Sequence, residues 1–512
     1  MSAVPETAGP AGAGLLVLCP LRLEARAVSS ASVGATVVRT GAGMSKAAAA
    51  ADRALAGRAP GPVAVAGVAG ALVDGLEPGT LVVADRVVDA ADGALVAELP
   101  SAALIAAALR RRGLPVVVGT VASSERLVRG SKARAGLAAL GAVAVDMETA
   151  AVLRRRWDRP VAVIRAIADT PGRELGSPST ISCGRRALGA LKAAAPVLEE
   201  WAAVTGARTV VLAGPRSFCA GVERAIETVS RALERFGAPV YVRRQIVHNR
   251  HVVEELEERG AVFVHELDEV PDGATVVYSA HGVSPAVRSA AAERQLEVID
   301  ATCPLVAKVH HEVHRFANRG YQVVLIGHAG HDETEGTLGE HPDVTLIENE
   351  ADVETIDVRD PERIAYITQT TLSPGDVTTV VSALSKRFPS IVGPSAGDIC
   401  YATQNRQEGV QAIAADCDLM IVVGSANSSN TARLVEVAER AGCRAVMVDD
   451  ESGVDLVSLR GVRTVGVSAG ASAPPILVDR LVRALSGLGP LEVEERAVRK
   501  ENVNFPLPLE VR

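Results

Sequence analysis

The 512-residue sequence contains no histidine before His248, and all ten histidines lie from that position onward. Acid–base chemistry in the first two hundred residues must therefore rely mainly on carboxylates, because imidazole is the side chain that normally titrates near neutral pH. Aromatic residues make up only 3% of the chain. The 48% hydrophobic content must consequently build its cores mainly from Val, Leu, Ile and Ala.

Other absences narrow the class of protein. No uninterrupted apolar run approaches the roughly 18–20 residues of a membrane span. The start of the chain has no basic stretch before an apolar run, which predicts no secretion signal. A net charge of −8 argues against nucleic acid or an anionic membrane surface as the main partner. Seven cysteines, an odd number, fit a reducing cytoplasm better than a disulfide framework. We therefore expect a cytoplasmic protein.

The length exceeds what one hydrophobic core usually supports, so we expect more than one domain. Short β-branched runs alternate with Ala/Leu/Arg segments, which predicts an α/β fold with a mainly parallel or mixed sheet. The Ala/Gly/Pro-rich residues 1–13 are expected to be disordered. The first domain is expected at 14–203, a linker at 204–208 and the second domain at 209–512. Pro196 is expected to kink or divide the helix 185–203.

The periodicity predicts individual elements in both parts. In the first part it predicts strands at 15–18, 36–39, 63–65, 81–83 and 161–167 and helices at 47–56 and 149–155. In the second part it predicts helices at 220–236 and 252–259 and strands at 209–212, 240–242, 261–264, 275–279, 298–301, 322–326, 364–368, 419–423, 445–448 and 464–467.

Three cysteines, Cys219, Cys303 and Cys400, lie in predicted loops at strand ends, next to turn-forming residues. They are about 84 and 97 positions apart, which predicts three sub-units that each contribute one ligand. A cubic iron–sulfur cluster is normally held by four thiolates, so three would leave one iron free to bind a substrate. The remaining cysteines are expected to be ordinary core residues.

Polar loops follow several predicted strands of the second part. Open α/β sheets bind ligands outside the carboxyl ends of their strands. The loops at 279–282, 327–333, 368–371 and 424–430 are rich in His, Ser, Thr and Asn, side chains of the kind that grip a diphosphate. His331 and Glu333 lie in a Gly-flanked loop that suits proton transfer. The residues Ser428, Ser429 and Asn430 are also expected to cap the helix that follows them.

A zinc hydrolase is the main alternative for these cysteines and histidines. The sequence has no His-Glu-X-X-His helix and no paired Cys-X-X-Cys of the structural zinc type. Widely separated single cysteines can also bind zinc, so spacing alone leaves this alternative open.

A set of motifs runs in order from about Thr209 to the end of the chain. The motifs are Phe218-Cys219-Ala220-Gly221-Val222, Val247-His248-Asn249-Arg250, Ser279-Ala280-His281-Gly282-Val283, Ala301-Thr302-Cys303-Pro304, Gly327-His328-Ala329-Gly330-His331, Thr368-Gln369-Thr370-Thr371-Leu372, Asp398-Ile399-Cys400-Tyr401-Ala402-Thr403, Ser428-Ser429-Asn430 and Ala469-Gly470-Ala471-Ser472-Ala473-Pro474. Together they closely resemble the 4-hydroxy-3-methylbut-2-enyl diphosphate reductase family, whose enzymes catalyse the last step of the non-mevalonate isoprenoid pathway. One departure is Ser217, where the family usually has Gly.

The resemblance implies a trefoil of three α/β units around a 4Fe-4S cluster held by Cys219, Cys303 and Cys400, with one open iron site. It implies that Glu333 donates a proton, with His331 and Thr370 relaying or orienting it. The implied substrate-binding residues are His248, His281, His331, Thr370, Ser428, Ser429, Asn430 and Ser472.

The sequence carries no convincing nicotinamide site of its own. Residues 40–46 contain only part of a dinucleotide-binding fingerprint. Electrons are therefore expected from a separate protein of the ferredoxin or flavodoxin type. The alternative function is an iron–sulfur redox sensor that keeps the three-cysteine cluster and turns over no substrate, with a silent nucleoside-binding module in the first part.

Residues 14–203 resemble the nucleoside phosphorylase and nucleosidase superfamily. The resemblance implies Asp169 as the general acid, Glu148 as the ribose ligand, Met147 packing at the sugar and Glu24 positioning the attacking water. Cleaving a purine N-glycosidic bond needs such a carboxylic acid and no histidine. Hydrolysis and phosphorolysis both stay open, as does a silent binding module. The motifs are Thr40-Gly41-Ala42-Gly43, Gly67-Val68-Ala69-Gly70-Ala71-Leu72, Glu77-Pro78-Gly79-Thr80-Leu81-Val82-Val83-Ala84, Val145-Asp146-Met147-Glu148-Thr149-Ala150-Ala151 and Arg165-Ala166-Ile167-Ala168-Asp169.

Overall fold

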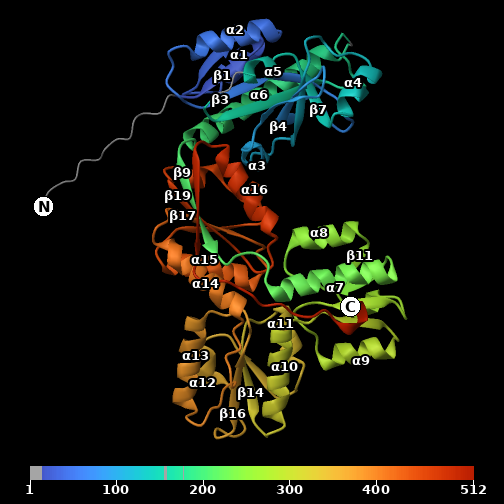
Figure 1. Cartoon of the computed structure of the whole chain (residues 1–512), viewed down its shortest axis with the longest axis vertical. Helices are drawn as coiled ribbons and strands as arrows, with labels where there is room; N and C mark the ends of the chain where they lie inside the picture. The colour runs from blue at the N-terminus through green and yellow to red at the C-terminus, as the bar shows by residue number, and fades with distance from the viewer. Residues whose placement is uncertain (1–13, 155–157, 177) are drawn as a thin grey trace, which may run out of the picture. The chain divides into compact units, whose positions relative to one another are not determined.

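The computed structural model of the protein describes residues 14–154, 158–176 and 178–512 (Figure 1). The expected disordered segment 1–13 lies outside these residues. The chain divides into two compact units. The first unit contains the described chain up to Thr209 together with Asp450–Arg463 and Asp479–Glu492, and the second contains the remainder. Across the described ranges, none of the helices combines the length and the apolar character that a bilayer crossing requires.

One mixed sheet of eight strands organises the first unit. Its strand order is β2-β1-β3-β7-β6-β4-β5, and β8 pairs with both β3 and β4. Strands β3, β7, β6, β4 and β8 therefore pair in a closed ring. The strands are β1 (Leu16–Cys19), β2 (Thr36–Arg39), β3 (Val63–Ala71), β4 (Leu81–Asp89), β5 (Leu95–Glu98), β6 (Val116–Ser123), β7 (Ala142–Asp146) and β8 (Val161–Asp169).

Six α-helices accompany this sheet in the described residues up to Thr209. They are α1 (Arg22–Ser29), α2 (Met44–Leu55), α3 (Ala102–Arg111), α4 (Ser131–Ala138), α5 (Thr149–Leu153) and α6 (Thr180–Ala203). The expected division of the last helix at Pro196 is wrong, because α6 continues through that residue. Proline keeps helical φ and removes only one backbone donor. Extensive burial on both sides of Pro196 holds the helix together.

Three separate sheets form the second unit, with strand orders β11-β10-β12-β13, β15-β14-β16 and β18-β17-β19-β9-β20. Together with the first sheet they confirm the predicted α/β class and the three α/β units of the second part. The strands are β9 (Arg208–Gly214), β10 (Val240–Arg243), β11 (Ala261–Val264), β12 (Thr275–Tyr278), β13 (Glu297–Asp300), β14 (Gln322–Ile326), β15 (Val344–Ile347), β16 (Ile364–Thr368), β17 (Leu419–Val423), β18 (Ala445–Val448), β19 (Thr464–Ala469) and β20 (Leu491–Ala497).

Helices cover each of these sheets (Figure 1). The central strands β14 and β17 are buried along their whole length. Such continuous apolar runs are typical of parallel strands that are covered on both faces. The helices are α7 (Ala220–Phe236), α8 (Arg250–Glu258), α9 (Pro285–Glu293), α10 (Pro304–Ala317), α11 (Asp332–Leu338), α12 (Glu350–Thr355), α13 (Pro374–Arg387), α14 (Tyr401–Ala414), α15 (Ser429–Arg440) and α16 (Pro475–Ser486).

The chain passes from one sheet to the next at α7, α10 and α14. Helix α7 follows β9 of the five-stranded sheet, and its Val229 packs in the core of the four-stranded sheet. Helix α10 follows β13 of that sheet, and its Val313 packs in the core of the three-stranded sheet. Helix α14 returns the chain to the five-stranded sheet, where its Val410 packs. These three passages determine where the site residues meet.

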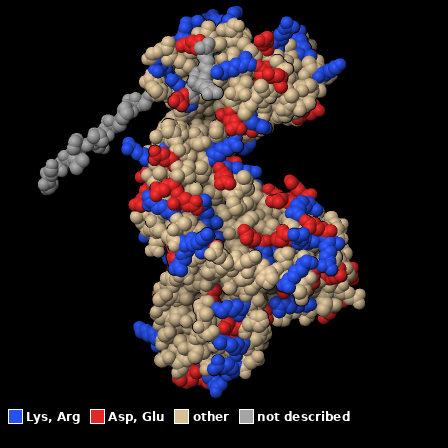
Figure 2. All heavy atoms as spheres, viewed as in Figure 1, with Lys and Arg blue, Asp and Glu red and all other residues tan. Residues whose placement is uncertain are grey.

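Charged side chains of both signs are interspersed on the face shown in Figure 2. On that face, the described residues form no extended area of a single sign.

Candidate functional site

Each of the three loop cysteines occupies the N-cap position of one of the connecting helices. Cys219 caps α7, Cys303 caps α10 and Cys400 caps α14. The positive end of a helix dipole favours a thiolate at this position. The three thiols therefore lie at the three places where the chain changes sheet.

One expectation about these loops is wrong. Cys219 and Cys303 follow strands β9 and β13, but no strand directly precedes Cys400. The segment between α13 and α14 forms only an isolated bridge from Val392 to Ala365. Its Gly- and Pro-containing run at 393–397 disfavours regular pairing.

The three cysteines line one cavity and are free thiols. A Cβ added to Gly221 would lie 2.7 Å from Cys303 Sγ and 3.8 Å from Cys219 Sγ, so only glycine leaves room between these sulfurs. Burial raises the pKa of Cys303 to about 12, and repulsion from the other two thiols adds to this rise. Burial also raises the pKa of Cys400. Such a crowded set of thiols ionises readily only when a metal centre is bound to it.

The same cavity is also lined by polar side chains from several loops. They are His248, His281, His331, Thr370, Ser428, Ser429, Asn430 and Ser472, all of which the sequence singled out. Both side-chain amide atoms of Asn430 and the Nε2 atom of His248 are buried without a hydrogen-bond partner. Buried polar atoms are normally paired, so these orphaned atoms indicate a polar ligand.

Local hydrogen bonds fix several of these side chains. Ser428 caps α15 and accepts from the Thr431 N–H at 3.4 Å, as expected from the sequence. Ser429 Oγ accepts from the Thr371 hydroxyl at 3.1 Å. Ser472 Oγ donates to the backbone carbonyl of His248 at 3.0 Å. Loops that lie far apart in the sequence are thereby joined around the cavity.

Glu333 is the buried carboxyl group of the cavity, with only 2% of its surface exposed. Its Oε1 accepts from the Thr370 N–H at 2.7 Å, and its Oε2 accepts from the Thr370 hydroxyl at 2.9 Å. Burial raises the pKa of Glu333 to about 7, although the two Thr370 bonds oppose this rise. The carboxyl group can therefore hold a proton near neutral pH and release it.

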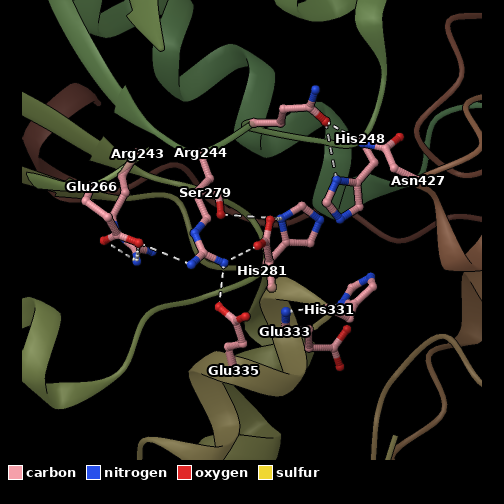
Figure 3. A network of polar contacts seen from close by, with 12 residues as sticks. Arg243, Arg244, His248, Glu266, Ser279, His281, His331, Glu333, Glu335 and Asn427 are labelled. Atoms are coloured by element: carbon pink, nitrogen blue, oxygen red, sulfur yellow. Dashed lines mark hydrogen bonds and ion pairs between the residues drawn. The ribbon is translucent and has the colours of Figure 1, made fainter. Parts of the chain in front are cut away.

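His331 caps α11 beside this carboxyl group. Its Nδ1 accepts from the Glu333 N–H at 3.1 Å, which leaves the Nε2–H as the donor of the neutral ring. Figure 3 shows His331 and Glu333 side by side at the start of the helix, with His281 nearby.

Three further histidines, His310, His311 and His314, lie on helix α10 after Cys303. His310 Nδ1 and His314 Nε2 each lie 2.7 Å from the Glu340 carboxylate, and His311 is exposed. Glu340 therefore engages two of the three, away from the cysteine-lined cavity.

Sequence reasoning missed Arg406, which is fully buried on α14. Its guanidinium donates to the Ser217 carbonyl at 2.7 and 3.1 Å and to the Phe218 carbonyl at 3.1 Å. It also pairs with Glu501 at 3.0 Å. Arg406 thus ties the Cys219 loop to the helix that begins at Cys400. A signal was present, since 406 shares the apolar face of positions 402, 410 and 413.

The candidate residues of the first unit also lie close to one another. Glu24 accepts from the Val68 N–H at 2.8 Å, and Glu148 accepts from the Gly43 N–H at 2.9 Å. Burial raises the pKa of both glutamates. The Arg165 guanidinium contributes an opposing effect at both. Met147 is half-buried.

Asp169 has a partner that the sequence did not predict. The buried Arg134 guanidinium forms an ion pair with its carboxylate and donates to the Ala71 carbonyl at 2.5 Å. A Cβ on Gly70 would lie 3.0 Å from Asp169 and 3.2 Å from Arg134, so this corner is closely packed. The two partners are 35 positions apart, and no local pattern links them.

Comparisons with known proteins support the resemblance of both units. Residues 210–486, more than half of the chain, match the family described as LytB protein, and residues 26–199 match the Phosphorylase superfamily. The 4-hydroxy-3-methylbut-2-enyl diphosphate reductase of Alcanivorax borkumensis is 54% identical over 306 residues, which are 59% of this chain and 98% of that protein. Reductase 1 of Mycobacterium tuberculosis is 54% identical over 322 residues, 62% of this chain and 97% of that protein.

A solved structure gives the same result. The E-1-hydroxy-2-methyl-but-2-enyl-4-diphosphate reductase from Plasmodium falciparum covers 60% of this chain and 97% of its own, with 38% identity and a TM-score of 0.58. The resemblances stated from the sequence are thereby confirmed.

The first prediction concerns the hydrogen bonds from the Arg406 guanidinium to the Cys219 loop. Replacing Arg406 by Met leaves the Ser217 and Phe218 carbonyls without their charged donor, an interaction worth roughly 1.5–3 kcal/mol. We expect the amides of the Cys219 loop to exchange hydrogen roughly 10- to 100-fold faster, measured by mass spectrometry. The matched control is Arg499→Met, which removes an exposed arginine paired with Glu408. Equal exchange rates of these amides in the two variants would contradict the proposal that Arg406 holds the Cys219 loop in place.

Proposed function

The chain belongs to the LytB protein family, and we propose that its second unit reduces 4-hydroxy-3-methylbut-2-enyl diphosphate to isopentenyl and dimethylallyl diphosphates. The overall change consumes two electrons and two protons, breaks the C–O bond to the hydroxyl group and releases water. The observation that carries the proposal is the shared cavity. Three N-cap thiols line it together with polar side chains, among which Asn430 and His248 carry buried atoms without a partner.

Enzymes of this family are iron–sulfur proteins, and the donor set of the cavity fits such a group. We propose that Cys219, Cys303 and Cys400 hold a 4Fe-4S cluster with one iron free of protein ligands. The missing side chain of Gly221 provides the space between two of these sulfurs. When bound, the cluster supplies electrons and a Lewis-acidic iron that weakens the C–O bond.

The polar side chains that line the cavity are proposed to bind the diphosphate. Asn430 offers both amide atoms, and His331 offers its Nε2–H. The hydroxyl groups of Ser428, Ser429, Ser472 and Thr370 can donate to phosphate oxygens after rotation about their C–O bonds. With the diphosphate held by these side chains, the hydroxyl group of the substrate is proposed to face the cysteines.

Glu333 is proposed to deliver a proton to the reacting carbon skeleton. The backbone and hydroxyl of Thr370 fix both of its oxygens, so the carboxyl group keeps one orientation. Because its pKa is raised to about 7, most of it is protonated below that pH and deprotonated above it. Turnover limited by this proton should fall as the pH rises through that value.

The electrons are proposed to come from a separate ferredoxin or flavodoxin-type protein. The seven free cysteines support a reducing compartment, and we place the protein in the cytoplasm.

The Glu333 role is tested by anaerobic turnover of the hydroxylated diphosphate with dithionite-reduced viologen. Wild-type protein should form the two product diphosphates, whereas a redox sensor would form none. Glu333→Gln keeps the size of the side chain and removes its acid, so turnover should fall roughly 100-fold or more. The exposed Glu350→Gln serves as the control. Near-normal turnover of Glu333→Gln with intact iron content would remove this residue from the mechanism.

A second function is favoured for the first unit. We propose that this unit binds a purine nucleoside without cleaving it. A general acid must carry a proton, but the Asp169 carboxylate is engaged by the Arg134 guanidinium in a buried, closely packed corner. Glu148 accepts from the Gly43 N–H through Oε1, and we propose that its carboxylate recognises the ribose hydroxyl groups.

This proposal predicts the outcome of a nucleoside assay. Methylthioadenosine and adenosine should bind to wild-type protein, measured by calorimetry, without release of free adenine. Arg134→Met removes the ion-pair partner of the Asp169 carboxylate and frees this group to reach a bound base, which should make adenine release detectable. The double variant with Asp169→Asn should be silent again. Adenine release by wild-type protein would contradict the assignment.

A further inference from the structure

The side chains that line the cavity carry no fixed positive charge. Among the described residues that line it there is no lysine or arginine, and its only cationic candidates are His248, His281 and His331. A diphosphate carries several negative charges, and burying charge without compensation is costly. The inference that follows rests on the proposed function, because it concerns how this same site compensates the charge of its substrate.

The three imidazole rings are closely grouped. The ring centroids of His248 and His281 lie 4.0 Å apart in a stacked arrangement, and His331 lies 5.2 and 5.8 Å from them (Figure 3). Burial lowers the pKa of all three, that of His331 to about 4 and that of His281 well below its usual range. Without ligand the rings are therefore neutral at pH 7.

Hydrogen bonding distinguishes His248 from His331. His331 already presents an Nε2–H, because its Nδ1 accepts from a backbone N–H. At His248, Nδ1 faces the side-chain oxygen of Gln245 at 3.5 Å. That oxygen accepts from the Asn427 amide at 2.8 Å, which fixes it as an acceptor. The proton of neutral His248 therefore lies on Nδ1, and its Nε2 is a bare lone pair.

A bare nitrogen repels phosphate oxygens, which are also acceptors. His248 Nε2 is buried and has no partner. Gaining a proton lets it donate to a phosphate oxygen while Nδ1 keeps its contact with Gln245, and this makes the ring an imidazolium. The bond would then be charge-assisted, which is the stronger kind.

The carboxylate of Asp332 supplies a negative charge that can compensate this imidazolium. Asp332 Oδ2 lies 3.9 Å from His281 Nδ1, and the negative charge of Asp332 opposes the lowering of the pKa of His248 and His331. The Arg244 guanidinium holds Asp332 in an ion pair and also contacts Glu335 at 2.7 Å (Figure 3). The titratable or charged groups around the three rings are Asp332, Glu333, His328 and Arg244, and the three cysteines line the same cavity.

We propose that diphosphate binding is coupled to the uptake of one proton from solvent at His248 Nε2. Asp332, fixed by Arg244, is the positioning residue whose negative charge supports the resulting imidazolium. The proton is released again when the product diphosphate leaves. The site thereby acquires positive charge only while an anion occupies it.

The proposal is tested by calorimetric titration of the cluster-containing protein with inorganic diphosphate at pH 7.5. Two buffers with different ionisation enthalpies reveal how many protons are taken up. We expect about one proton per bound diphosphate, and binding that weakens roughly tenfold per pH unit at higher pH. His248→Gln should abolish the uptake, which separates it from any protonation of the diphosphate itself.

Asp332→Asn tests the positioning role. The amide still accepts from Arg244 but carries no charge, so the decline in affinity should begin about one pH unit lower, with roughly tenfold weaker binding at pH 8. Asp357→Asn, at an exposed acid, should keep the wild-type pH profile. A uniform loss of affinity at every pH would instead assign Asp332 a merely structural role.

Two further results would overturn the inference. One is diphosphate binding without proton uptake, or uptake that persists in His248→Gln, in a protein that turns over the hydroxylated substrate; the proposed function would then still stand. The other is binding that requires an added divalent cation in place of the proton. Absence of both diphosphate binding and turnover would instead remove the proposed function itself.

Discussion

The second unit depends on one constraint, the convergence of three buried thiols at the points where the chain passes between its sheets. Each thiol caps the helix that begins the next α/β unit. The cavity is therefore built at the boundaries of the three cores and not inside any of them. Displacing one connecting helix would separate the thiols and also misplace the loops that carry the polar side chains of the cavity. Arg406 joins two of these connections with hydrogen bonds to backbone carbonyls.

Burial decides the protonation chemistry of this cavity. Desolvation raises the pKa of Glu333 and of the Cys303 thiol, and it lowers the pKa of the three histidines. Each shift favours the neutral form, so the unliganded cavity carries little charge. An iron–sulfur cluster, a diphosphate and protons then supply charge together when they bind. This explains how a cavity without lysine or arginine in its described lining can serve a highly charged substrate.

Much of this fold could be predicted from the sequence. The strands at 322–326, 364–368, 419–423 and 445–448 are observed at those bounds, because continuous β-branched runs flanked by turn residues leave little ambiguity. Strands β5, β6 and β7 of the first unit were not predicted. The register of β6 and β7 depends on pairing in the closed ring, and that of β5 depends on its pairing with β4, which no local pattern reveals. The same holds for the passage before Cys400, where a loop takes the place of a strand.

The candidate site could be predicted where its reactive and polar side chains lie in short sequence motifs. The cysteines and the Ser, Asn and His residues of the loops were singled out by type and position, and the structure brings them to one cavity. The ion pairs between residues far apart in the sequence could not be predicted. The pairs Arg134–Asp169, Arg244–Asp332 and Arg406–Glu501 join positions at least 35 residues apart. Only folding reveals which charges become neighbours.

The most direct test of the three-thiol centre is Mössbauer spectroscopy, together with iron and sulfide analysis, on oxygen-free protein. About four irons and four sulfides per chain are expected, with one iron whose spectrum differs from the others and changes when substrate is added. Zinc in place of iron, or four iron sites that do not respond to substrate, would contradict the account.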